Sequence, residues 1–343
     1  MKRPHPSHRH LPGVFVAGPE GCESTSATPT VDTARRRFVA GALVATAGAV
    51  ALSSRPVDAF AQSSEAIAFG DGELFMLGDG AMRLPAGFLV PESVAAPERE
   101  QALELAGIGG DTVERPLNVT LWRQGARTVL FDAGSGSQFL DGTGRLPESL
   151  EAAGVDPSEI TDVVFTHAHP DHLWGVIDDF DDVLFAEATF HIGAREHDHW
   201  MDAGTLSRTP EERQGFVVGA QGRLPRLDER LRRFAGGEEV LPGIEAVDSF
   251  GHTPGHTSFV LHADGADPIM VIGDALAHDV LSFERPDLPF AGDEDPSAAA
   301  ATRRALLDRL VGDGVRAIGY HLSAPGLGRV ERDGEAFRWV AAG

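Results

Sequence analysis

The pattern of apolar and polar positions predicts alternating short strands and helices from about residue 70 onward. Runs rich in β-branched and aromatic residues predict strands over 73–77, 117–123, 128–131, 163–165, 188–192, 244–250, 258–262, 269–272 and 315–318. Helical spacing of apolar residues predicts helices over 91–106, 147–153, 194–201 and 296–310. The strands form two groups with helices between them, which favours two sheets packed face to face under outer helices.

The same pattern predicts the structure or the exposure of three further stretches. Residues 62–70 should be a frayed start, and the polar, arginine-rich residues 209–235 should be a mobile surface segment. In the last predicted helix, the apolar spacing turns Arg303 and Arg304 toward solvent.

The predicted strand 163–165 is followed at once by a dense group of side chains that can bind metal. The group comprises His167, His169, Asp171 and His172. Pro170 disfavours a helical backbone at His169, so His167 and His169 should point to the same side of an extended segment. Imidazole and carboxylate together suit first-row divalent metals.

Three later predicted strands also end in side chains of this kind. The segments are Phe250-Gly251-His252-Thr253-Pro254-Gly255-His256-Thr257, Gly273-Asp274 and Gly319-Tyr320-His321. Taken singly, each is more often a turn histidine or a strand-ending aspartate without function. Together with the 167–172 group they predict one metal site at a common rim of the sheets.

Composition limits the partners and the cofactor chemistry. The formal net charge of −23 disfavours nucleic acid as a partner. The only cysteine, Cys22, falls in the first 61 residues, which carry an Arg35-Arg36 pair, an apolar run and Ala59-Phe60-Ala61. We expect residues 1–61 to be a twin-arginine-type signal peptide removed at export to the periplasm, with no stable membrane insertion afterwards. Residues 62–343 would then form a single domain without thiolate ligands.

The order HxHxDH, GHTPGH, GD and a late histidine resembles the metallo-β-lactamase superfamily. The resemblance implies an α+β fold, a four-layer αββα sandwich of two mixed sheets with outer helices. It implies a first metal on His167, His169 and His252, a second on Asp171, His172 and His321, and Asp274 bridging the two. It implies that Asp132 orients the ligands from behind. His256 would support the ligands or stabilise its turn, and His278 would either support the ligands or touch the substrate.

The implied cofactor is a pair of divalent ions, zinc first, with manganese, iron and cobalt as alternatives. Seven ligands for two ions leave coordination positions open, as a catalytic site requires. The implied reaction is attack by a metal-bridging hydroxide on a small neutral ester, lactone or phosphotriester with an apolar leaving group. Asp171 would also relay a proton to that group.

Several segments resemble the exported methyl parathion hydrolase-type branch of the superfamily, among them 70–72, 273–278 and 320–328. Acyl-homoserine lactone hydrolases typically carry a tyrosine three residues after the bridging aspartate, where this chain has Ala277. That activity therefore stands as one alternative. The others are a persulfide dioxygenase with one non-haem iron and a metal-binding protein without catalysis.

The substrate pocket is the least constrained part of the prediction. Its candidate walls are Trp174, Phe180, Trp200, Leu281 and Phe283, each of which could equally belong to the core. No cluster of basic residues marks a grip for an anionic substrate, so a neutral small molecule is preferred, with the arginine-rich segment 223–233 as counter-evidence. The resemblance leaves a homodimer open.

Overall fold

The structure, a computed structural model, describes residues 65–342, which form two seven-stranded sheets. The first sheet runs in chain order: β1 (Ile67–Phe69), β2 (Gly72–Pro85), β3 (Thr112–Gln124), β4 (Arg127–Phe131), β5 (Asp162–Val164), β6 (Thr189–Gly193) and β7 (Leu231–Phe234). Strands β1 to β4 pair antiparallel, and β4 to β7 pair parallel.

The second sheet has the order β14 (Ala336–Ala341), β13 (Leu327–Asp333), β12 (Arg316–Gly319), β11 (Ile269–Gly273), β10 (Thr257–Leu261), β9 (Ile244–Asp248) and β8 (Glu239–Leu241). Its neighbours pair antiparallel except β11 and β12, which are parallel. Both sheets are therefore mixed, as the fold prediction required.

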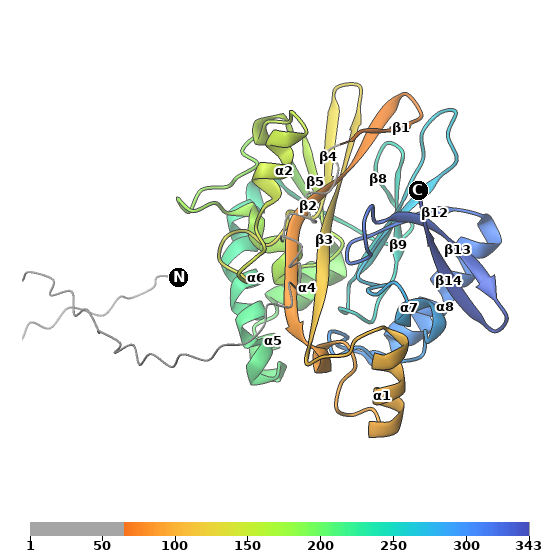
Figure 1. Cartoon of the computed structure of the whole chain (residues 1–343). Helices are drawn as coiled ribbons and strands as arrows, with labels where there is room; N and C mark the ends of the chain where they lie inside the picture. Colours follow the sequence, from red (N-terminus) through yellow and green to blue (C-terminus); the bar gives the residue numbers. More distant parts are fainter. Residues whose placement is uncertain (1–64, 343) are drawn as a thin grey trace, which may run out of the picture. The chain divides into compact units, whose positions relative to one another are not determined.

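Helices lie outside each sheet (Figure 1). They are α1 (Ala96–Leu105), α2 (Leu146–Ala152), α3 (Pro170–Leu173), α4 (Ala194–Met201), α5 (Thr205–Arg208), α6 (Gln214–Leu227), α7 (Leu281–Glu284) and α8 (Pro296–Asp313). Helix α1 lies at the lower end of β2 and β3 (Figure 1). Short 3-10 turns lie at Ala86–Phe88, Pro157–Glu159, Trp174–Val176, Glu211–Arg213 and Asp228–Arg230. The α+β, four-layer fold class is confirmed.

The core is layered because successive strand residues point to opposite faces. In β5, Val163 belongs to the apolar cluster that includes Leu224 of α6, whereas Val164 belongs to the cluster between the sheets with Phe259 of β10. A third cluster joins the outer face of the second sheet to Leu307 of α8. Each sheet is thus buried on both faces over its centre, so residues without a packing role lie mainly in the loops at the ends of the strands.

Three expectations from the sequence are corrected by the structure. Residues 209–235 are not a surface segment without regular structure: they contain α6 and β7, and Val217, Ala220 and Leu224 are fully buried. The helical spacing there was hidden by the arginines between the apolar positions. Residues 67–69 form β1 rather than a frayed start.

The third correction concerns Arg303, which is 1% exposed rather than facing solvent. Its Nη1 donates to Asp293 Oδ2 at 3.0 Å, its Nε donates to the Pro286 carbonyl and its Nη2 to the Leu288 carbonyl, each at 2.8 Å. Sequence spacing does not reveal a partner such as Asp293, which is supplied by the preceding loop.

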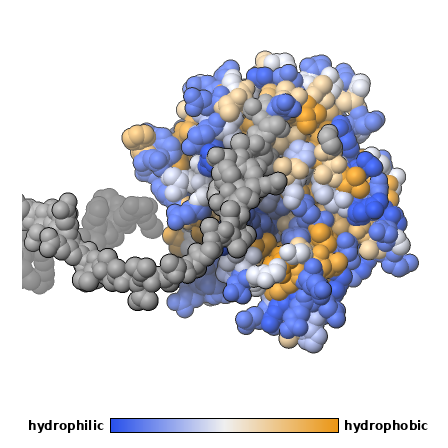
Figure 2. Space-filling model, viewed as in Figure 1, coloured by the Kyte–Doolittle hydropathy of each residue, from blue (hydrophilic) through white to orange (hydrophobic). Residues whose placement is uncertain are grey.

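The surface agrees with the acidic composition. Figure 2 shows a largely hydrophilic face on which apolar residues gather in a few groups, one of them just above α1. Within residues 65–342, no helix has the length and apolar character needed to cross a membrane. The predicted leader, with Arg35, Arg36 and the expected cleavage site, lies outside the described residues.

Candidate metal centre

The first four candidate ligands lie in the turn from β5 into α3. His169 has φ −64° and ψ 159°, an extended conformation, and Pro170 is the first residue of α3. The proline therefore acts as the sequence predicted, since it ends the extended segment and starts the helix that carries Asp171 and His172. All four side chains are buried.

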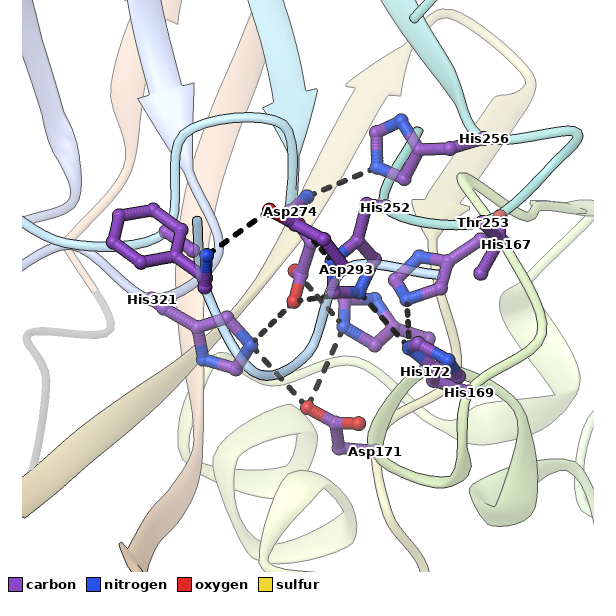
Figure 3. Close-up of polar contacts among 12 residues, drawn as sticks. His167, His169, Asp171, His172, His252, Thr253, His256, Asp274, Asp293 and His321 are labelled. Atoms are coloured by element: carbon purple, nitrogen blue, oxygen red, sulfur yellow. Dashed lines mark hydrogen bonds and ion pairs between the residues drawn. The ribbon is translucent and has the colours of Figure 1, made fainter. Parts of the chain in front are cut away.

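Three imidazoles meet at the start of this turn (Figure 3). His167 Nε2 and His252 Nε2 lie 3.0 and 2.9 Å from His169 Nδ1. Burial, followed by the neighbouring imidazoles, holds the pKa of His167 well below its usual range, and the same holds for His169. Neutral imidazoles whose nitrogens converge are what a divalent cation requires.

Beside them lies a second group with two carboxylates. His321 Nε2 lies 3.3 Å from Asp171 Oδ2 and 3.0 Å from Asp274 Oδ2, and His172 Nε2 lies 3.1 Å from Asp274 Oδ1. Asp274 Oδ2 also lies 3.4 Å from His252 Nε2. Asp274 is therefore in contact with both groups, which is the arrangement expected of a ligand shared between two ions.

The residues present fit a metal centre. Three triads have ligand atoms within 4.8 Å of one another: His167/His169/His252, His167/His172/Asp274 and Asp171/His172/His321. Within residues 65–342, His172 Nε2, Asp274 Oδ1 and His321 Nε2 are buried without a hydrogen-bond partner. Buried polar atoms are normally satisfied, and ions bound among these atoms would satisfy all three. The structure thus brings all seven predicted ligands together.

The ligands are oriented from behind by side chains that the sequence partly predicted. Asp132, after β4, accepts from the Thr166 amide at 2.7 Å and lies 2.8 Å from His172 Nδ1. Its φ of 65° is a left-handed conformation, which turns the chain sharply after β4. His321 Nδ1 lies 2.9 Å from the Pro116 carbonyl. Such contacts fix which nitrogen of each ring faces the centre.

The two remaining candidates, His256 and His278, differ in whether they contact a ligand. His256 Nε2 accepts from the Asp274 amide at 3.0 Å, and its Nδ1 lies 2.8 Å from Ser249 Oγ. Burial lowers the pKa of His256 to about 3, so the ring is neutral and can accept this bond. His278 instead uses Nδ1 to accept from the Val280 amide at 3.1 Å, at the start of α7. Its observed bonds are those of a turn-stabilising residue.

Two supporting carboxylates were not found from the sequence. Glu196 of α4 is fully buried and accepts from the Ala168 amide at 2.9 Å, the Gly255 amide at 3.0 Å and Thr253 Oγ1 at 2.7 Å. It therefore ties the two histidine-bearing turns together. Asp293 Oδ1 lies 3.3 Å from His252 Nδ1. Neither residue is near a histidine motif in sequence, so no local signal marks them.

A cavity of about 200 Å³ opens onto the cluster. Its walls are mostly apolar and include Met82, Leu84, Phe88, Phe139, Leu140 and Phe216, with Arg115 and Arg213 as its basic residues. Five of the ligands also line it: His169, Asp171, His252, Asp274 and His321. A small, mainly apolar ligand would have its polar group against the cluster.

None of the five pocket walls predicted from the sequence lines this cavity. Phe180 is 86% exposed. Leu281 is fully buried in the apolar cluster that includes Ala102 of α1, and Phe283 is fully buried in the cluster on the outer face of the second sheet. Trp174 packs edge-on against Phe139 with ring centroids 5.7 Å apart, and so supports a wall without forming one. Trp200 lines a neighbouring polar cavity of about 470 Å³.

Comparison with known proteins agrees with this geometry. The family model described as the metallo-beta-lactamase superfamily matches residues 112–321. The chain therefore belongs to the metallo-β-lactamase superfamily.

Particular relatives narrow the comparison. AidC, described as a dizinc quorum-quenching lactonase, is 28% identical with a TM-score of 0.75, over 81% of this chain and 97% of AidC. The hydrolase AbOPH is 26% identical with a TM-score of 0.74 over the same shares. An N-acyl homoserine lactonase of Bacillus sp is 24% identical over 47% of this chain. The match spans 55% of that lactonase, so the chain covers about half the length of this curated relative.

Proposed function

We propose that the protein is a metal-dependent hydrolase that opens small lactones at a centre of two divalent ions. The observation that carries the proposal is the convergence of five histidines and Asp171 around the carboxylate of Asp274, facing an apolar cavity. The likeness to AidC supports both the pair of ions and the lactone substrate, with zinc as the first expectation.

The chain's own residues would divide the work as follows. His167, His169 and His252 would hold one ion, Asp171, His172 and His321 the other, and Asp274 both. When bound, the ions supply a water of lowered pKa and positive charge beside the substrate carbonyl. The apolar walls would take the acyl part of the substrate and keep bulk water out.

Asp171 would relay the proton to the leaving group. Its carboxylate lies 9% exposed at the cavity wall, and Tyr320 Oη donates to its backbone carbonyl at 2.6 Å, which holds the start of α3 in place. Ring opening adds water across the acyl C–O bond and gives one alcohol and one carboxylic acid, which releases a proton to become the carboxylate. The alcohol oxygen needs a proton, and Asp171 would relay it because its carboxylate lines the cavity.

Acyl-homoserine lactones are the lactone class that the relatives favour. This alternative is better supported than the aryl esters and phosphotriesters expected from the methyl parathion hydrolase-type resemblance. The phosphotriester remains a second candidate from the methyl parathion hydrolase-type resemblance, and the likeness to AbOPH supports only a hydrolase of the superfamily.

A substrate panel tests the proposal. The protein loaded with zinc is assayed on an acyl-homoserine lactone, an aromatic lactone, an aryl ester, a phosphotriester and a β-lactam. We expect the highest kcat/KM on a lactone and little or no β-lactam turnover. A phosphotriester or β-lactam as the preferred substrate would overturn it.

Metal analysis and one variant separate the remaining alternatives. About two zinc ions per chain favour the hydrolase, and about one iron favours a dioxygenase. Asp274→Asn removes the carboxylate that contacts both ligand groups, so we expect a loss of at least about 100-fold in kcat together with a lower metal content. Unchanged turnover by this variant would place the reaction elsewhere.

A further inference from the structure

One arginine in the cavity has incomplete hydrogen bonding. Arg115 lies on β3, paired across the sheet with Met82 of β2, and its side chain lines the cavity above the ligand cluster. The residue is 7% exposed. Its Nη2 donates to the Ala277 carbonyl at 3.4 Å and lies 3.8 Å from Asp274 Oδ2. Its Nε is buried without a partner in the part of the chain that the structure describes.

Arg303 shows what a structural arginine at similar burial looks like in this fold. All three of its guanidinium nitrogens donate, at 2.8 to 3.0 Å, to two carbonyls and to the carboxylate of Asp293. By contrast, Arg115 makes one long bond, and the carboxylate nearest to it is Asp274, the residue placed to serve both ions. A guanidinium carries five N–H donors, so most of those on Arg115 remain for another molecule.

The local sequence explains how the guanidinium comes so close to the centre. The residue three positions after Asp274 is Ala277. Acyl-homoserine lactone hydrolases of the superfamily typically carry a tyrosine there. Ala277 is buried, and its carbonyl is the acceptor that holds Nη2. A methyl side chain at this position lets the arginine from β3 lie next to Asp274.

We propose that Arg115 is a catalytic residue that donates hydrogen bonds to the substrate's acyl oxygen and then to the carboxylate of the product. This inference rests on the proposed hydrolysis of a lactone or ester. As water adds to the carbonyl carbon and the ring C–O bond breaks, negative charge develops on the acyl oxygen and ends on the carboxylate. Arg115 stays protonated throughout and acts only as a donor.

The charge of the cavity supports this role. Few acidic groups face Arg115: Asp274 at 3.8 Å is its only ion-pair partner within residues 65–342. Once Asp274 is shared with two cations, little of its charge is left for the guanidinium. An anion that forms during the reaction would then be attracted to Arg115, and the neutral substrate would not be, so the interaction favours the transition state.

The experiment compares Arg115→Met and Arg115→Lys with Arg123→Met, all in the zinc-loaded full chain. Arg123 lies on the same strand but pairs with Glu73 at 2.9 Å on the surface, so it is the matched control. We expect Arg115→Met to lower kcat/KM about 100- to 1000-fold through kcat, with unchanged metal content and Tm. Arg115→Lys should recover part of the loss, and Arg123→Met should stay within threefold of the unmodified protein.

Two further measurements complete the test. One measures product binding without turnover, and the other distinguishes a direct role of the guanidinium group from a merely structural role of Arg115. Calorimetry should show that ring-opened N-hexanoyl-homoserine, a carboxylate, binds Arg115→Met at least tenfold more weakly than the unmodified protein. Guanidinium ion should partly rescue the turnover of Arg115→Ala. A kcat/KM of Arg115→Met within threefold of the unmodified value, unchanged product binding, or a loss wholly explained by missing metal would overturn the inference.

The failure of the proposed function is distinguishable from the failure of this inference. If the unmodified protein hydrolyses an ester and no lactone, the lactone proposal fails, whereas the Arg115 variants are still compared on that ester. If no substrate of the panel is hydrolysed, the carboxylate-binding comparison decides on Arg115 alone.

Discussion

At the scale of single residues, two neighbouring arginines of α8 show how burial decides what a charge contributes. Arg303 is 1% exposed and ion-paired with Asp293, whereas Arg304 is half exposed and paired with Asp287 on the surface. Removing one partner of a buried pair leaves an uncompensated charge in the interior.

We therefore expect Arg303→Ala to lower the free energy of unfolding by about 3–5 kcal/mol. Arg304→Ala should lower it by no more than about 1 kcal/mol, because its ion pair is screened by water. Urea unfolding of both variants measures the difference. Equal losses in the two variants would contradict the burial argument.

Asp79 gives a pH dependence that can be tested. It is fully buried and accepts from the Ser135 amide at 2.7 Å and the Leu146 amide at 2.8 Å. Burial raises the pKa of Asp79 to about 6, against an unfolded value near 3.8. Between these two values the folded state holds the proton and the unfolded state has released it, so the contribution of Asp79 to stability falls as pH rises.

The contribution present below pH 4 should therefore shrink by about 3 kcal/mol as pH rises through 6. Asp79→Asn cannot ionise and lacks this dependence. Unfolding of the two proteins at several pH values between 3.5 and 7.5 should show the variant gaining relative to the unmodified protein as pH increases. A constant difference across that range would show that the pKa is not raised.

At the scale of elements, α4 serves the site although it carries none of the ligands. Glu196 on this helix joins the turn after β5 to the turn after β9 through Ala168, Thr253 and Gly255. Its fourth bond, from Trp200 Nε1 at 2.6 Å, fixes its own side chain. The helix thus sets the spacing between the imidazoles of two turns that are far apart in sequence.

Glu196→Gln replaces one accepting oxygen with a donor that faces other donors. We expect the affinity for the ion held by His167, His169 and His252 to fall about 10- to 100-fold, as for other groups that orient ligands. Asp198→Asn, an exposed change on the same helix, is the control. Competition with a chromophoric chelator measures both, and equal affinities would show that Glu196 does not position the turns.

How much the sequence predicts follows from the same elements. The ligand turns were predictable because each is local: a buried strand, a Pro or Gly turn and a histidine or aspartate lie within a few residues, as in 163–172. The mixed two-sheet fold followed from strand grouping and from the family resemblance. Glu196, Asp293 and Arg115 were missed because each acts on residues more than 25 positions away, and nothing near them in sequence shows it.

The prediction of the cavity walls was wrong for a related reason. An aromatic residue in a helix or loop has the same sequence signature whether it packs in the core, as Phe283 does, or lines a cavity, as Phe216 does. Phe216 lies on α6, where the arginines between the apolar positions masked the helical period. Tertiary packing, which spacing does not encode, decided both outcomes.

At the scale of the whole molecule, the ligand cluster lowers the stability of the folded protein when no ions are bound. Asp171 and Asp274 are buried with five imidazoles, and those of His167 and His252 lie about 3 Å from that of His169. Ions bound only by the folded state stabilise it by mass action, by about 4 kcal/mol at 1000 times the dissociation constant.

Chelation should therefore lower Tm by at least about 8 °C for a domain of this size. Returning zinc should restore the original value, which separates metal loss from irreversible damage. Asp274→Asn should show a smaller shift on chelation, since it lacks the shared carboxylate. A Tm that does not respond to chelation in the unmodified protein would contradict the predicted coupling between metal and folding.

The division of the ligands between the two sheets also bears on how the molecule is made. Four of the seven belong to the turn after β5, and His252, Asp274 and His321 follow strands of the second sheet. A nascent chain leaving the ribosome therefore carries an unfinished set of ligands until β12 has been synthesised. Completion of the centre requires both sheets, so an ion retained there is a mark that synthesis has passed His321.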